Sequence, residues 1–152
     1  MRFVTFTRRN ERRIGLMGPQ DQIIDLAEVN RRLLKNGNAS YLTSMQAFIE
    51  GGSRAIQVAH QAEKYVAAKN IADQKKLAAV GALLRPNQAK IIAPIPVPKK
   101  NVVMLGINYR EHVDEGARAR SLDIKYPDYP VFFTKPSTSI IGHFGKVINH
   151  KV

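Results

Sequence analysis

Four prolines between residues 86 and 98 constrain the possible folds of this chain more than any other feature. They forbid a helix across LLRPNQAKIIAPIPVPKK and favour an extended segment that lies over the surface. The pattern of apolar residues also differs on the two sides of this segment. We therefore predict a small domain at residues 1–93, a proline-rich linker at 94–100 and the beginning of a second domain at 101–152. The prolines are Pro86, Pro94, Pro96 and Pro98.

The first eighty residues change from a strand pattern to a helix pattern. Short apolar stretches at 2–6, 12–17 and 22–26 are separated by turn residues and predict an antiparallel meander. From Leu26 onward the apolar residues follow helical spacing, with Asp25 placed to cap this helix and Gly37 to end it.

Two further helical segments follow this first helix. TSMQAFIEGG predicts a short helix, and residues 53–80 predict one long helix or two helices with a break near Asn70. His60 lies inside the second segment, where we expect a partly buried structural histidine and not a ligand.

Beyond the prolines, the sequence indicates strands. NVVMLGI, at 101–107, is a nearly continuous apolar run and predicts a strand buried on both faces. VFF at 131–133 predicts a core strand, and 139–150 predicts two strands joined by a glycine turn. The fold class expected for the whole chain is therefore α+β, in which a small domain of short antiparallel strands and helices precedes a β-rich region.

The net charge of +12 admits three interpretations. Residues 1–76 carry 13 basic and 7 acidic side chains, and residues 77–152 carry 11 and 5, so the excess is spread evenly. Basic clusters are short and do not alternate with aromatic residues, as a base-stacking surface would require. A solvated basic surface is favoured over a nucleic-acid binder, and an acidic portion outside this chain would also balance the charge.

The composition excludes other classes of protein. The sequence has no cysteine, so it has no disulfide framework and no thiolate nucleophile or ligand. It also has no run of about 20 apolar residues, and the segment after Phe6 is too polar for a signal peptide. We expect a cytoplasmic protein with no membrane and no nucleic-acid partner.

The segment GINYREHVDEG places a histidine and a carboxylate three residues apart, directly after the buried-looking run. His112 and Glu115 would share one side of a helical turn, where a carboxylate can orient an imidazole or a water and the imidazole can transfer a proton. A surface ion pair has the same spacing. A metal site is also conceivable, but one histidine and one glutamate do not make a full ligand set.

Two motifs in combination give the second half of the chain a family resemblance. PIPVPKKNVVMLGINYREHVDE, followed by YPVFFTKPSTSIIG, resembles the fumarylacetoacetate hydrolase family. The N-terminal segments resemble the small domain that many bacterial members carry. The residues that match the motifs are Gly106, Asn108, Tyr109, His112, Glu115, Pro130, Phe133, Lys135, Pro136, Ser137, Thr138 and Ser139.

The resemblance implies an enzyme that hydrolyses, decarboxylates or tautomerises 2-oxo acids and diketo acids with Mg²⁺ or Mn²⁺. His112 would be the general base, and Glu115 would orient it or hold a water. Asn108 and Tyr109 would line the pocket or cap the turn, and Lys135 would meet a substrate carboxylate or remain an exposed lysine. Residues 116–128 would form a mobile lid.

The chain departs from the family pattern in its metal ligands. These are a Glu-x-Glu pair and a later aspartate, which follow the matched elements and do not occur here, so we assign no metal ligand to this chain. We expect the opening part of a β-rich roll, inactive alone, that forms a homodimer through the catalytic domain in the complete enzyme. Its open strand edges would need another polypeptide. The alternatives are a basic module that binds nucleic acid or an acidic partner, and a non-catalytic assembly domain.

Overall fold

A computed structural model describes residues 1–35, 37 and 39–149 of the chain. It divides into two compact units, Met1–Pro96 together with the residues from Ile141 onward, and Val97–Ile140. Both helices and antiparallel strands are present, so the predicted α+β class is confirmed. Among the described residues, no helix is both long and apolar enough to cross a bilayer.

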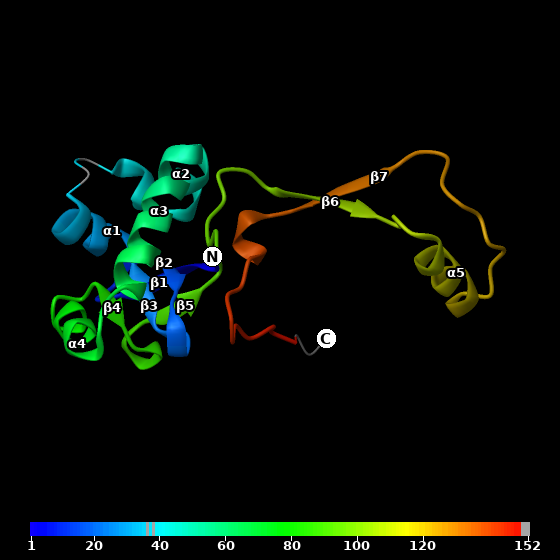
Figure 1. Ribbon diagram of the computed structural model, residues 1–152. Coiled ribbons are helices and arrows are strands. Elements are labelled where there is room, and N and C mark those ends of the chain that lie inside the picture. Colours follow the sequence, from blue (N-terminus) through cyan, green and yellow to red (C-terminus); the bar gives the residue numbers. More distant parts are fainter. Residues whose placement is uncertain (36, 38, 150–152) are drawn as a thin grey trace. The chain divides into compact units, whose positions relative to one another are not determined.

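A five-stranded antiparallel sheet forms the base of the first unit (Figure 1). Its order is β4-β3-β2-β1-β5, so the predicted three-strand meander is confirmed at its centre. The turn between β1 and β2 has Arg9 and Asn10 at positive φ, as a two-residue hairpin that follows the twist of its strands requires. The strands are β1 (Phe3–Arg8), β2 (Glu11–Met17), β3 (Ile23–Asp25), β4 (Leu83–Leu84) and β5 (Lys90–Ile92).

The prediction of a surface segment at 86–98 is wrong for part of its length. Lys90–Ile92 joins the sheet as the edge strand β5, where Thr5 pairs with Ile92 and Thr7 with Lys90. The Thr5 hydroxyl also donates to the Pro94 carbonyl at 2.5 Å. Pro86 and Pro94 flank β5 and so leave its backbone N–H groups free to pair, which explains why the prolines do not prevent a strand.

The first helix begins where the sequence predicts it but ends earlier. The Asp25 side chain accepts a hydrogen bond from the Glu28 N–H at 3.1 Å, so the predicted cap of α1 (Leu26–Val29) is confirmed. A π-helical turn over Asn30–Leu34 continues α1. The predicted end at Gly37 is wrong, because Lys35 already adopts left-handed backbone with φ 52°. Its N–H closes the turn on the Asn30 carbonyl at 2.7 Å.

The helical segment after residue 44 has the predicted division. It contains α2 (Met45–Glu50), α3 (Gly52–Ala67) and α4 (Ile71–Ala79). The predicted break is confirmed, because the Asn70 side chain caps α4 by accepting from the Asp73 N–H at 2.9 Å. The prediction for His60 is wrong, since 54% of its side chain is exposed, 3.8 Å from Glu63. The buried stripe of α3 faces away from this position.

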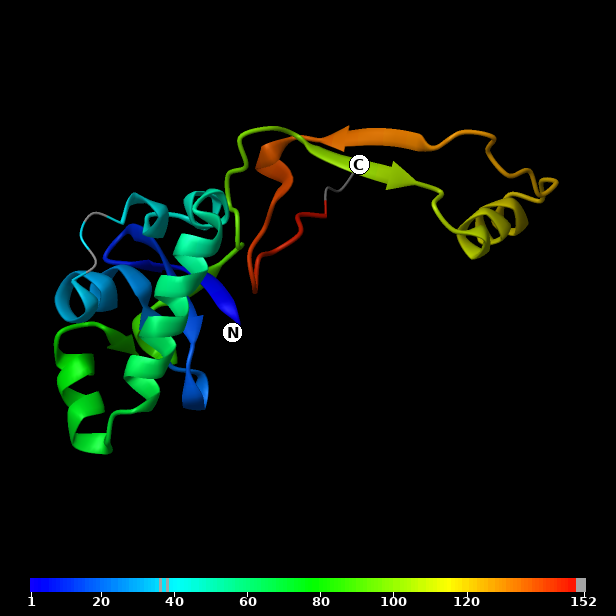
Figure 2. The same cartoon turned by 45° about the horizontal axis from the view of Figure 1, so that its top comes forward.

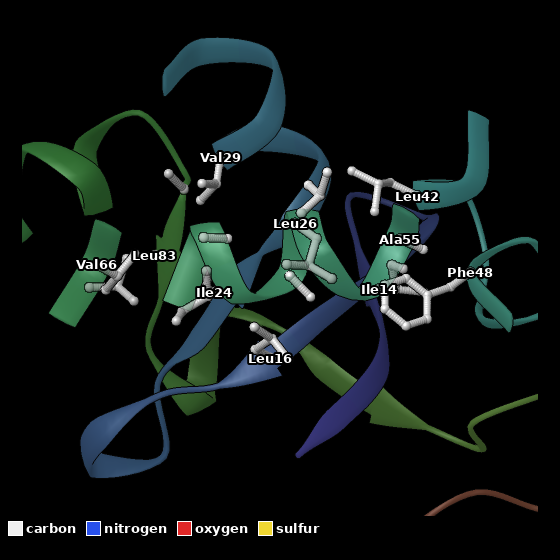
Figure 3. Packing of buried hydrophobic residues seen from close by; sticks show 14 of the residues in the cluster. Ile14, Leu16, Ile24, Leu26, Val29, Leu42, Phe48, Ala55, Val66 and Leu83 are labelled. Carbon is white, nitrogen blue, oxygen red and sulfur yellow. The ribbon is translucent and has the colours of Figure 1, made fainter. Parts of the chain in front are cut away.

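The core of the first unit lies between α3 and one face of the sheet, as Figure 3 shows. The small residues Ala55, Ala59 and Ala62 on α3 are fully buried and let the helix approach the strands closely. Opposite them stand Ile14, Leu16 and Ile24. Burying a leucine or isoleucine fully contributes about 1.5–3 kcal/mol, so this layer dominates the stability of the unit. A smaller cluster of Phe6, Ile23 and Leu84 lies on the other face of the sheet.

The second unit is an antiparallel ribbon of two strands with a helix at one end (Figure 2). The elements are β6 (Val102–Gly106), α5 (Arg110–Ala119) and β7 (Val131–Lys135). The predictions of a strand buried on both faces and of a core strand are wrong for this chain. Val103 on β6 and Phe132 on β7 are each 67% exposed. Two strands supply no second layer, so large apolar side chains of both strands remain exposed.

The prediction of two strands at 139–150 is also wrong. A single 3₁₀ turn covers Ser137–Ser139, and residues 140–149 form no strand. His150, at the end of the predicted segment, lies outside the described residues. An apolar pair such as Ile140 and Ile141 favours extended backbone, but a strand also needs a partner, and neither edge of the ribbon pairs with these residues.

Candidate functional site

A sharp turn after β6 starts the candidate site. Ile107 has φ 48°, a left-handed conformation that costs an L-residue about 1–2 kcal/mol and is rare for a β-branched side chain. This left-handed residue turns the backbone out of the ribbon and into α5. Tyr109 occupies the N-cap position of α5 with extended backbone, and its side chain makes no capping hydrogen bond. Asn108 is exposed in this turn.

His112 and Glu115 lie on one side of α5 and are both exposed. In the described part of the chain no ion pair joins them, so the alternative of a surface ion pair is not what the structure shows. The ring centroids of His112 and Tyr109 are 5.4 Å apart, with the planes tilted by 56°. The prediction that His112 and Glu115 share one side of a helical turn is confirmed. Their catalytic roles stay predictions.

His112 lines a surface hollow of about 370 Å³ beside α5. Glu115 is not part of its lining. Three segments line the hollow: the helix α5, the turn that precedes it and the segment that follows it. The lining residues are Ile107, His112, Val113, Gly116, Ala117, Arg120, Leu122, Asp123 and Lys125.

The end of α5 explains why the following segment returns along the helix. Ser121 has φ 53°, and its N–H donates to the Arg118 carbonyl at 3.2 Å. The Leu122 N–H donates to the Ala117 carbonyl at 3.0 Å. This pair of bonds is a Schellman motif, which reverses the chain and brings the residue after the left-handed position back against the last turn. Residues 122–125 thereby form the outer wall of the hollow.

A second contact fastens the returning segment to α5. The Tyr126 hydroxyl donates to Asp114 Oδ1 at 3.0 Å, and the Arg110 guanidinium carbon lies 5.4 Å from the centre of the Tyr126 ring. The hydrogen bond to Asp114 raises the pKa of the Tyr126 hydroxyl, because the bond favours the protonated phenol. Sequence reasoning missed this contact, although the i,i+4 spacing of Arg110 and Asp114 signals a shared helix face. The segment predicted as a lid, 116–128, therefore begins inside α5 and is hydrogen-bonded to it near its end.

Lys135 lies at the other end of the ribbon from α5. It pairs with Val102, whereas Gly106, next to α5, pairs with Val131. The two pairs are four positions apart along the strands. At a rise of about 3.3 Å per residue, the distance between them is about 13 Å. The structure does not bring Lys135 to His112, and the role of Lys135 as a substrate ligand stays a prediction.

No group of three or more histidine, aspartate or glutamate side chains in residues 1–35, 37 and 39–149 could hold a metal ion. Near His112 the carboxylates Asp114 and Glu115 belong to α5, and Asp114 accepts the bond from Tyr126. The described residues therefore do not make a divalent-cation site by themselves.

A charged cluster in the first unit is structural. Asp25 is fully buried, with its Oδ2 2.7 Å from Arg13 Nε, and Glu28 binds Arg31 and Arg32 at 2.8 and 2.7 Å. Burial raises the pKa of Asp25 more than Arg13 lowers it. Burial also tends to raise the pKa of Glu28, but the hydrogen bonds from Arg32 and Arg31 outweigh it, so that pKa lies below its ordinary value. The cluster holds α1 to β2.

Comparison with known proteins gives matches that run through both units. Over 99% of its length the chain is 29% identical to oxaloacetate tautomerase YisK of Bacillus subtilis. The chain is similar to oxaloacetate tautomerases. Over 105 residues, 69% of the chain, it is 30% identical to mitochondrial oxaloacetate tautomerase Fahd2a of Rattus norvegicus. An uncharacterized protein of Archaeoglobus fulgidus is 39% identical over 54 residues. No family model matches the chain.

The matches cover only part of each relative. The chain spans 46% of the Bacillus protein, 27% of the rat protein and 18% of the Archaeoglobus protein. The Bacillus match extends over nearly the whole chain, so it includes the helix with His112, the ribbon and the N-terminal sheet. The similarity to the Bacillus protein therefore covers the sequence of both units and not one motif alone.

Proposed function

We propose that this chain is part of a fumarylacetoacetate hydrolase family enzyme that interconverts the keto and enol forms of a 2-oxo acid. The observation that carries the proposal is the similarity to an oxaloacetate tautomerase along 99% of the chain. The position of His112 at a hollow beside a strand–turn–helix junction agrees with it. Hydrolysis and decarboxylation of related acids, the other outcomes implied by the resemblance, also form an enolate, that of the shortened acid, but have no counterpart in the relatives' names.

His112 is proposed to move the proton. Tautomerisation breaks a C–H bond at the carbon next to the 2-oxo group, leaves the electron pair as an enolate and adds a proton to the oxygen. An imidazole can accept the first proton and return it. Glu115, one turn along the same helix, is proposed to orient the imidazole or a water once substrate is bound.

The divalent cation implied by the resemblance would stabilise the enolate oxygen, which is the chemistry a hard metal ion supplies. Its carboxylate ligands would come from polypeptide other than the described residues. This chain's own contribution is proton transfer and binding of the acid. Asn108 and Tyr109, which are exposed beside His112, are proposed to contact the substrate from the turn.

The ribbon is proposed to pack against further polypeptide in the complete enzyme, including a second copy in a homodimer. Residues on both of its faces support this proposal. Val103, Leu105 and Phe132 share one face by the strand register, and Val131 and Phe133 lie on the other, all at least 42% exposed. A free-standing two-stranded ribbon is marginally stable in water, so both faces need a cover.

The test of the proposed reaction is His112→Ala in the complete gene product. Loss of a general base lowers the rate by about 10²–10⁴-fold. We therefore expect kcat for oxaloacetate enolisation, followed by enol absorbance, to fall in that range while the circular dichroism spectrum is unchanged. His60→Ala is the matched control, because His60 is an exposed helical histidine of the first unit. An H112A enzyme with activity within twofold of wild type removes His112 from the mechanism.

A further inference from the structure

We infer that the hollow beside α5 binds the second carboxylate of a dicarboxylic 2-oxo acid, with Arg120 and Lys125 as the binding cations. The inference rests on the proposed function and adds to it two residues that set specificity for the second carboxylate. Neither cation belongs to the motifs that carry the family resemblance.

Gly116 leaves the helix surface open between the proposed base and the proposed anion site. His112, Gly116 and Arg120 are spaced four residues apart and share one face of α5. A methyl group added at Gly116 would meet nothing within 4 Å, so no packing requires glycine there. Glycine inside a helix costs about 1 kcal/mol relative to alanine. Because Gly116 has no side chain, the hollow is deeper at this position.

The charges of the lining suit one carboxylate. Arg120 and Lys125 both line the hollow, and in the described part of the chain neither forms an ion pair. Asp123 lies in the same lining, so Arg120, Lys125 and Asp123 together carry a net charge of +1. A guanidinium can hold a carboxylate through two parallel hydrogen bonds. A polyphosphate would meet too little positive charge, and an apolar ligand would leave both cations without a partner.

The span of the hollow suits a diacid. Eight residues of helix separate His112 from Arg120, about 12 Å between their Cα atoms at about 1.5 Å per residue. Both residues line the hollow, so the imidazole can reach the carbon that loses the proton while the guanidinium meets the second carboxylate, which is bonded to that carbon. A monocarboxylic 2-oxo acid lacks this second carboxylate.

The outer wall is held in place on both sides of Lys125. The Schellman motif at Ser121 brings Leu122 back to the helix, and Tyr126 is bonded to Asp114. Lys125 directly precedes the bonded Tyr126, so its backbone is fixed close to α5. Less side-chain and loop entropy is lost when a segment is already held in its binding conformation.

The test compares substrates in the complete gene product. Arg120→Gln should lower kcat/KM for oxaloacetate at least tenfold, mainly through KM, and leave kcat/KM for enolisation of 2-oxobutyrate, a monocarboxylic acid, within twofold. Lys125→Gln should act in the same direction with a smaller effect. Arg118→Gln is the matched control, an exposed arginine of α5 that does not line the hollow. Equal losses for both substrates, or no loss for either, would overturn the inference and leave the proposed function standing.

A binding measurement separates the two proposals. Succinate, a dicarboxylic acid without a 2-oxo group, should shift the amide signals of residues 112–125 in ¹H–¹⁵N spectra of the complete gene product, and butyrate should not. The R120Q variant should lose the succinate shifts and R118Q should keep them. If the wild-type enzyme acts on no 2-oxo acid, the proposed function fails, and these spectra alone decide the anion site. Identical responses to succinate and butyrate, or none, would refute it.

Discussion

Asp25 offers the sharpest test of how charge and hydrogen bonding share the stability of the first unit. Its carboxylate caps α1 at the Glu28 N–H, 3.1 Å away, and lies 2.7 Å from Arg13 Nε with no exposure to solvent. Loss of a cap costs about 1 kcal/mol. Arg13 would also lose Asp25 as a partner. This loss costs only about 1–2 kcal/mol, because Arg13 keeps ion pairs with Glu11 at 3.1 Å and Glu28 at 3.4 Å.

We therefore expect Asp25→Ala to lower the free energy of unfolding by about 2–3 kcal/mol. Asp25→Asn should cost only about 1 kcal/mol, because asparagine caps a helix as well as aspartate does and its amide oxygen can still accept a hydrogen bond from Arg13. The raised pKa supports the small value, since it shows that burial disfavours the ionised carboxyl more than Arg13 favours it.

Urea unfolding followed by circular dichroism at the helical band measures these differences, and the sequence has no tryptophan that would report on them. Asp21→Ala is the control, because this carboxylate is exposed and 3.8 Å from an exposed Arg2. It should change stability by less than about 0.5 kcal/mol. A raised native pKa binds protons more readily in the folded state, so the advantage of wild type over D25N should grow as the pH falls toward about 3.9. Equal losses in D25A and D25N would refute the reasoning.

Three further predictions concern the other elements. Ser121→Gly should stabilise the end of α5 by about 0.5–1 kcal/mol, because glycine adopts the left-handed conformation without strain. Slower amide hydrogen exchange at residues 117–122 would measure this stabilisation. The lowered pKa of Glu28 stabilises the fold above its unfolded pKa of about 4.3, and this contribution is lost as the pH falls, so Glu28→Gln should flatten the acid limb of an unfolding curve. In this chain alone, the amides of β6 and β7 should exchange far faster than those of β1 and β2, and equal protection would contradict the proposal that the ribbon needs a cover.

Features encoded by neighbouring residues could be predicted from the sequence. The Asp25 and Asn70 caps each join atoms three residues apart, and the central strands follow a local alternation of apolar residues. The pairing of His112 and Glu115 on one helix face likewise follows from spacing alone. The exposure of His60 could not be predicted, because it depends on which face of α3 meets the sheet.

The sequence by itself determined the α+β class, the three central strands of the first unit with the helices that follow them, and the helical turn that carries the histidine and the glutamate. Only the tertiary structure decided that residues 90–92 form an edge strand, because their partner lies more than eighty residues away. It also decided the outer wall of the hollow, which depends on a chain reversal at Ser121 and a hydrogen bond across twelve residues. Local pattern fixes which backbone conformation a segment prefers, whereas burial and pairing depend on what the rest of the chain brings to it.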